Sequence, residues 1–131
     1  MAHSIAPFLM FEGTAEAAMD FYVSLFPGSS VQSIARYGDE GPGKPGSVIL
    51  AAFVINGQTI MCIDSPAKHD FGFTPSVSLF VECADVEEID RLFAALSEGG
   101  QVLMPLDGCP FASRFGWVND RFGASWQLRL G

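Results

Sequence analysis

The order of hydrophobic and polar residues in the first half of the chain predicts one helix among four strands. Alternating or continuous apolar runs favour strands over residues 4–11, 31–37, 48–55 and 58–64. After the first strand, apolar residues recur every three or four positions from Ala15 to Phe26, which is the spacing of an amphipathic helix. Thr14 is a suitable N-cap for this helix, and Pro27-Gly28 ends it. Asn56-Gly57, between two apolar runs, predicts a tight hairpin.

The second half repeats this order. Strands are expected over residues 76–82, 101–104, 114–119 and 124–130, with a loop over residues 106–113. A helix begins after Asp85, whose spacing to Glu88 fits a capping box, and it ends at Gly99-Gly100. Thr14 and Asp85 lie 71 residues apart, and this shift places strand on strand and helix on helix. We therefore expect a single α+β domain over residues 1–131, made of two βαβββ modules at about 4–65 and 75–130, because neither module alone has enough chain for a sizeable core.

The alternation of side chains along a strand assigns a face to each residue. Residues expected beneath a helix are Val77, Leu79, Val81, Trp126, Leu128 and Leu130. Residues expected on the opposite face are Ser76, Ser78, Phe80, Glu82, Ser125, Gln127 and Arg129.

Composition narrows the class of protein. Seven basic against 15 acidic residues give a net charge of −8, which excludes a nucleic-acid footprint. The longest apolar run, residues 48–55, is far too short to span a bilayer, and no targeting segment is recognised. Cys62, Cys83 and Cys109 form no C-x-x-C pair, so neither a disulfide framework nor a zinc site is indicated. We expect a protein of the reducing cytoplasm.

Five segments carry a family resemblance: residues 7–11, 18–22, 25–28, 75–82 (PSVSLFVE) and 116–127 (GWVNDRFGASWQ). Together they resemble the vicinal-oxygen-chelate superfamily, which contains glyoxalase I, extradiol dioxygenases and the fosfomycin- and bleomycin-resistance proteins. Within it they resemble the PhnB-like branch, which carries the name 3-demethylubiquinone 3-methyltransferase. The resemblance implies curled mixed sheets around a cleft, helices on the outer faces, and a homodimer.

The resemblance also locates the positions where metal-dependent members hold a divalent ion with His and Glu. Here those positions are Pro7, Met61, Ser78 and Gln127. Proline has no donor, a thioether suits soft cations, and the serine and glutamine groups are neutral, so we expect no metal ion. Asp64 is predicted on the face opposite Met61, and His69 lies in the connector between the modules. His69 is adjacent to Asp70, but such a pair is common by chance.

The sequence leaves open whether the chain is an enzyme. It contains no G-x-G-x-x-G loop between a strand and a helix, so no cofactor motif supports the methyltransferase name, and we expect no cofactor. It contains no nucleophile elbow either.

The first functional hypothesis is a metal-independent cleft for an unidentified small molecule. Leu9, Phe11, Met61 and Phe80 are its expected apolar walls, and Ser78, Gln127 and Arg129 its expected polar contacts. One alternative is a non-catalytic protein that sequesters a ligand or drug, as bleomycin-resistance proteins do. Others are a regulatory module, or a cleft that its own side chains fill.

Overall fold

The computed structural model describes residues 1–131, and the chain divides into two compact units, Met1–His69 and Asp70–Gly131. Each unit contains a strand, a helix and then three strands. The α+β class and the tandem βαβββ order are therefore confirmed. Neither helix combines the length and the hydrophobicity that crossing a membrane requires.

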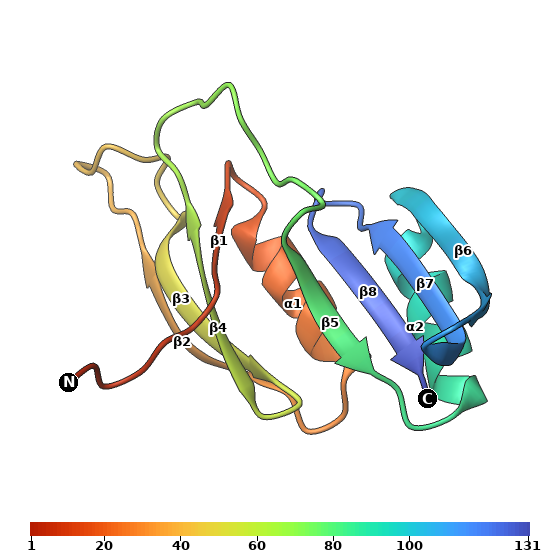
Figure 1. Ribbon diagram of the computed structural model, residues 1–131. Coiled ribbons are helices and arrows are strands. Elements are labelled where there is room, and N and C mark those ends of the chain that lie inside the picture. Colours follow the sequence, from red (N-terminus) through yellow and green to blue (C-terminus); the bar gives the residue numbers. More distant parts are fainter. The chain divides into compact units, whose positions relative to one another are not determined.

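The first unit is a mixed four-stranded sheet with α1 on one face (Figure 1). Its elements are β1 (Phe8–Phe11), α1 (Ala15–Leu25), β2 (Ser30–Arg36), β3 (Val48–Ile55) and β4 (Gln58–Asp64), in the sheet order β1-β4-β3-β2. β1 runs parallel to β4, and the other neighbours are antiparallel. The predicted helical stripe is buried, and the ring of Tyr22 packs on Phe53 with centroids 6.2 Å apart.

The turn between β3 and β4 is the predicted hairpin. Asn56 and Gly57 have φ angles of 48° and 83°. A two-residue hairpin turn needs this left-handed conformation at both positions, and asparagine and glycine adopt it most readily.

The second unit repeats the arrangement. Its elements are β5 (Ser78–Glu82), α2 (Val86–Ser97), β6 (Gln101–Cys109), β7 (Ala112–Asn119) and β8 (Ser125–Leu130), in the sheet order β5-β8-β7-β6. Trp126 and Leu128 are fully buried on the face that carries α2. A Cβ atom on Gly116 would lie 2.7 Å from the ring of Phe93, so glycine allows α2 to approach β7 closely.

The start of α2 is capped as the sequence predicts. The Glu88 amide donates to Asp85 Oδ1 at 2.8 Å. The Glu88 carboxylate in turn accepts from the amide of Ala84 at 2.7 Å, so the helix start and the residue before its cap are fixed together.

Two predictions about the strands are wrong. The first strands of both units are shorter than expected, and Val77, assigned to the core, lies exposed in a turn where its amide donates to Thr74. Residues 106–113, expected as a loop, are mostly the paired ends of β6 and β7. β6 is an edge strand, where a proline such as Pro105 is tolerated, and its pairing with β7 is interrupted by register shifts.

Candidate ligand-binding face

The face of the second sheet opposite α2 carries the polar residues predicted from the last strand and from residues 76–82. Ser78 pairs with Ser125 across β5 and β8, and Phe80 pairs with Gln127. Trp117 of β7 lies opposite Gln127 on the other side of β8. We call this surface the open face of the second sheet.

Four of these side chains form one hydrogen-bonded network, which we call the polar row. The Oγ atoms of Ser78 and Ser125 are 2.6 Å apart. Trp117 Nε1 donates to Ser125 Oγ at 2.8 Å, and Gln127 Nε2 donates to Ser78 Oγ at 3.1 Å. The network joins strands that are distant in sequence, and it holds the Gln127 amide in a defined position on the open face.

Aromatic rings stand beside the polar row. The ring centroids of Phe80 and Phe115 are 6.5 Å apart, and those of Phe115 and Phe111 are 5.1 Å apart in an edge-to-face arrangement. Phe80 is 52% and Phe111 54% exposed, whereas Phe115 is buried between them. The open face therefore combines a few fixed polar groups with a large apolar surface.

The charge of Arg129 is balanced within the unit. Arg129 Nη1 contacts both carboxylate oxygens of Glu82 at 2.8 and 2.9 Å, and Arg129 Nε donates to the carbonyl of Phe111 at 3.0 Å. Arg129 was expected as a polar ligand contact. Its position here links β8 to β5 and to the turn that carries Phe111.

Asn119 lies in register with Ser125 on the same face of β7 and β8. Its Oδ1 is a buried side-chain oxygen without a hydrogen-bond partner. Buried polar atoms in native proteins nearly always have a partner, so this oxygen is available to a donor such as water or a ligand.

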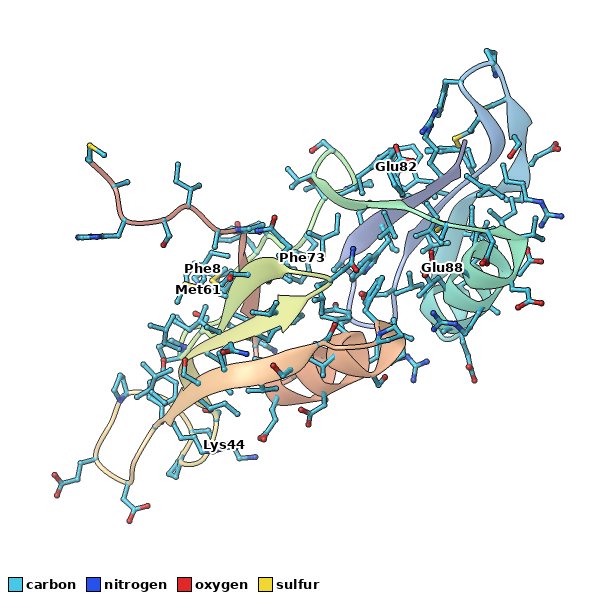
Figure 2. The ribbon with its side chains drawn as sticks, turned by 90° about the horizontal axis from the view of Figure 1, so that it is seen from below. Phe8, Lys44, Met61, Phe73, Glu82 and Glu88 are labelled. Carbon is cyan, nitrogen blue, oxygen red and sulfur yellow. The ribbon has the colours of Figure 1, made fainter.

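The predicted residues of the first unit lie on two different faces of its sheet. Met61 pairs with Phe8 on the face opposite α1, where the two side chains lie side by side (Figure 2). Leu9 and Phe11, expected in the cleft, pair with the buried Cys62 and Asp64 on the face that carries α1. Their assignment to the cleft is therefore wrong.

The cause of this error is a one-residue difference between the units. The helix caps Thr14 and Asp85 are 71 residues apart, but the helix-facing residues Leu9 and Leu79 are 70 apart. The second unit has one more residue between its first strand and its helix. A slip of one residue along a strand moves every side chain to the other face, so the 71-residue shift misplaces the whole of β1.

The positions to which the family resemblance assigns a metal ion do not fit one here. In the observed register the β1 residue beside Met61 is Phe8 rather than Pro7, and neither side chain offers a donor to a metal ion. Met61 offers a thioether, and the Ser78 hydroxyl is engaged by Ser125 and Gln127. The chain brings together no cluster of three His, Cys, Asp or Glu side chains that could hold a metal ion. These donors are neutral and unsuited to a hard divalent ion, so we derive no chemistry through a metal.

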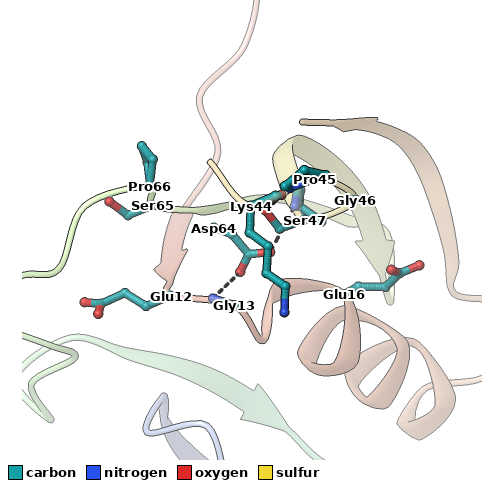
Figure 3. A pocket seen from close by; sticks show the side chains of 11 residues that line it. Glu12, Gly13, Glu16, Lys44, Pro45, Gly46, Ser47, Asp64, Ser65 and Pro66 are labelled. Atoms are coloured by element: carbon teal, nitrogen blue, oxygen red, sulfur yellow. Dashed lines mark hydrogen bonds between the residues drawn. The ribbon is translucent and has the colours of Figure 1, made fainter. Parts of the chain in front are cut away.

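Sequence reasoning missed a cavity of about 540 Å³ in the first unit, at the start of α1 (Figure 3). Asp64 is buried at its base and accepts from the amides of Gly13, Ala15 and Val48 at 2.8, 2.9 and 3.0 Å. Thr14 makes no side-chain cap, so Asp64 takes the role predicted for it. The one buried charge of this cavity is therefore fully used in joining the start of α1 to β3 and β4.

The rim of this cavity is also tied to the fold. Glu16 forms a two-point ion pair with Arg36, with both N–O distances 2.7 Å, and this pair lowers the pKa of the Glu16 carboxyl. Ser65 Oγ lies 2.8 Å from His69 Nε2, which ties the end of β4 to the segment after it. The contacts of Asp64, Glu16 and Ser65 therefore join segments of the first unit to one another.

The chain as a whole matches the model of one protein family. Residues 3–129 match the family described as 3-demethylubiquinone-9 3-methyltransferase. The chain belongs to this family. The PhnB protein from Bacillus cereus, which bears the same methyltransferase description, is 55% identical, with a TM-score of 0.95 over 98% of this chain and 100% of that chain. An uncharacterized protein from Mycobacterium bovis is 31% identical over 95% of this chain and 81% of its own length.

More distant solved structures show which fold the chain shares. The fosfomycin resistance protein FosX from Listeria monocytogenes has a TM-score of 0.59 at 14% identity, over 100% of this chain and 94% of that chain. That structure was determined with Mn(II) and a dihydroxypropylphosphonic acid. The likeness shows a shared glyoxalase/bleomycin-resistance-like fold, as the sequence predicts.

The methyltransferase family name implies a methyl donor, and the residues at the two strand–helix turns do not fit one. The turn before α1 contains one glycine, and its helix start is occupied by the Asp64 carboxylate. The start of α2 is occupied by Asp85. Neither turn forms a glycine-rich loop with free amides, so we derive no methyl-transfer step.

Proposed function

We propose that this family member binds a small organic molecule on the open face of the second sheet, without a resident metal ion. The observation that carries the proposal is the polar row of Ser78, Ser125, Gln127 and Trp117 beside the exposed rings of Phe80 and Phe111. Small-molecule sites typically combine apolar and aromatic walls with a few fixed polar groups.

The same face offers groups for binding but no evident group for proton transfer. The two serine hydroxyls bond to each other, and no histidine lies on β5, β7 or β8. The carboxylate of Glu82 is held by Arg129. A general base must reach the proton that it removes, and none is placed beside these serines. This supports reversible binding or sequestration of the ligand rather than its conversion.

A fragment screen tests the proposal. Aromatic fragments are titrated by calorimetry into the wild-type chain. Each fragment that binds is then recovered and analysed for chemical change. We expect binders whose affinity falls at least about fivefold in Gln127→Ala and Trp117→Phe. Gln58→Ala is the matched control, because Gln58 lies in the first unit, where its exposed side chain donates to the carbonyl of its neighbour Thr59.

Two results would contradict the proposal. One is binding that survives both substitutions on the open face unchanged. The other is chemical conversion of the bound molecule, which would establish catalysis in place of sequestration.

We also propose that two copies of the chain associate through the first unit. The face of its sheet opposite α1 is an uncharged apolar row, made of Phe8, Met10, Leu50, Ala52, Val54, Met61 and Ile63. Phe8 is 56% exposed, and a contiguous apolar surface of this kind marks an interface. A second copy offers an identical apolar row, whereas the net charge of −8 disfavours association through charged surfaces.

A further inference from the structure

The polar row leaves some of its hydrogen-bonding groups unused. Trp117 donates its only N–H to Ser125, and Gln127 donates one N–H to Ser78. Only one of the two serine hydroxyl hydrogens can lie between Ser78 and Ser125, so the other is available to a ligand. Gln127 Oε1 accepts no hydrogen bond from the protein. The row therefore presents a spare hydroxyl donor beside a spare carbonyl acceptor.

From this pattern we propose that the ligand of the open face is an uncharged, planar molecule with a hydrogen-bond donor and an acceptor on adjacent atoms, as in a cyclic amide or an aromatic carboxamide. The inference rests on the proposed function and specifies the ligand class for that same site. The ligand N–H donates to Gln127 Oε1, and the ligand carbonyl accepts from the spare serine hydroxyl. An unfilled carbonyl on a largely apolar face disfavours a ligand without a donor.

The balance of charge on the face favours a neutral ligand. On β5, β7 and β8 the charged side chains of this face are Glu82 and Arg129, and these two neutralise each other. An anionic ligand would find no unbalanced cation on this face, whereas β6 adds the carboxylate of Asp107 in register with Phe115. Removing an unpaired charge from water is costly, so neutral molecules bind better than anions at such a site.

The aromatic side chains favour a flat ligand. Phe80, Phe115 and Phe111 follow one another at centroid distances of 6.5 and 5.1 Å, and Trp117 lies next to Gln127 in the sheet register. Rings of this kind stack on planar groups, which places the edge of the ligand toward the polar row.

The test uses four related probes, each titrated by calorimetry. Isoquinolinone carries an N–H and a carbonyl on adjacent atoms, and its N-methyl derivative has lost the donor. Isoquinoline keeps the two rings without the amide, and naphthoate replaces the amide with an anion. We expect isoquinolinone to bind at least about fivefold more tightly than each of the other three.

Substitutions of Gln127 test whether this residue causes the preference for isoquinolinone. Gln127→Leu should abolish the preference for isoquinolinone over its N-methyl derivative, because Oε1 is lost. Gln127→Glu keeps an acceptor at the same place and should retain a preference for the N–H compound. Gln58→Ala should leave all four affinities unchanged.

The outcomes separate this inference from the proposed function. If the probes bind through the open face but isoquinolinone has no advantage, or if naphthoate binds best, the ligand class is wrong and the binding function stands. If none of the four binds, the ligand class is also wrong, and the fragment screen decides the binding function. If the isoquinolinone preference survives Gln127→Leu, the role given to the polar row is wrong.

Discussion

Replacement of Asp64 tests the most consequential contact that the sequence did not reveal. Its buried carboxylate accepts from Gly13, Ala15 and Val48. Ala15 and Val48 are fully buried, so Asp64→Ala leaves their two backbone amides without an acceptor and out of reach of water. The exposed Gly13 amide can instead bond to water. Each buried amide without an acceptor costs about 1–3 kcal/mol, so we expect the free energy of unfolding to fall by about 2–6 kcal/mol.

Asp64→Asn should cause only part of this loss of stability. Its amide oxygen can replace Oδ1, which serves both Gly13 and Ala15, but its NH₂ group then faces the Val48 amide. One backbone amide then lacks an acceptor, and we expect the free energy of unfolding to fall by about 1–3 kcal/mol. Thr14→Ala should change stability by less than about 0.5 kcal/mol, because the Thr14 side chain makes no cap. Asp85→Ala, which removes the side-chain cap of α2, should cost about 1 kcal/mol.

Urea unfolding followed by far-UV circular dichroism measures these losses. Tryptophan fluorescence serves as a reference for the second unit, because Trp117 and Trp126 both lie there. A cost below about 1 kcal/mol for Asp64→Ala, or a cost for Thr14→Ala as large as that of Asp64→Ala, would refute the reasoning.

Four further predictions follow from burial and surface character. Trp126→Ala should cost about 3–5 kcal/mol because the indole is fully buried, whereas Gln127→Ala should stay within about 1 kcal/mol; urea unfolding compares the two, and the reverse order would invalidate the face assignment. Burial raises the pKa of Cys62 and Cys83 from 9.0 to about 11, so thiol titration of the folded protein near neutral pH should find Cys109 alone reactive. Since folding disfavours both thiolates, stability should decline as the pH rises from about 9 towards 11, and equal stability across that range would contradict the two pKa values. Light scattering at micromolar concentration should return twice the mass of one chain, and a monomer would contradict the proposed association.

Sequence signals that span a few residues predicted the secondary structure well. The apolar stripe of each helix, the hairpin at Asn56-Gly57 and the Asp85–Glu88 cap depend on neighbours within one or two turns of chain. Such local preferences are written in the residues themselves, because backbone geometry fixes the helical and strand periods. The alternation in the last strand likewise placed Trp126 beneath α2 and Gln127 on the open face.

Contacts between distant residues needed the tertiary structure. Asp64 caps α1 across 49 residues of chain, and Ser78 meets Ser125 across 47. The face taken by Leu9 and Phe11 depends on how β1 registers against β4, and a single extra residue in the other unit was enough to mislead the repeat. The pattern of residues determined which segments become helices and strands. Only the pairing of strands decided which polar groups meet, because hydrogen bonds between remote side chains leave no periodic trace in the sequence.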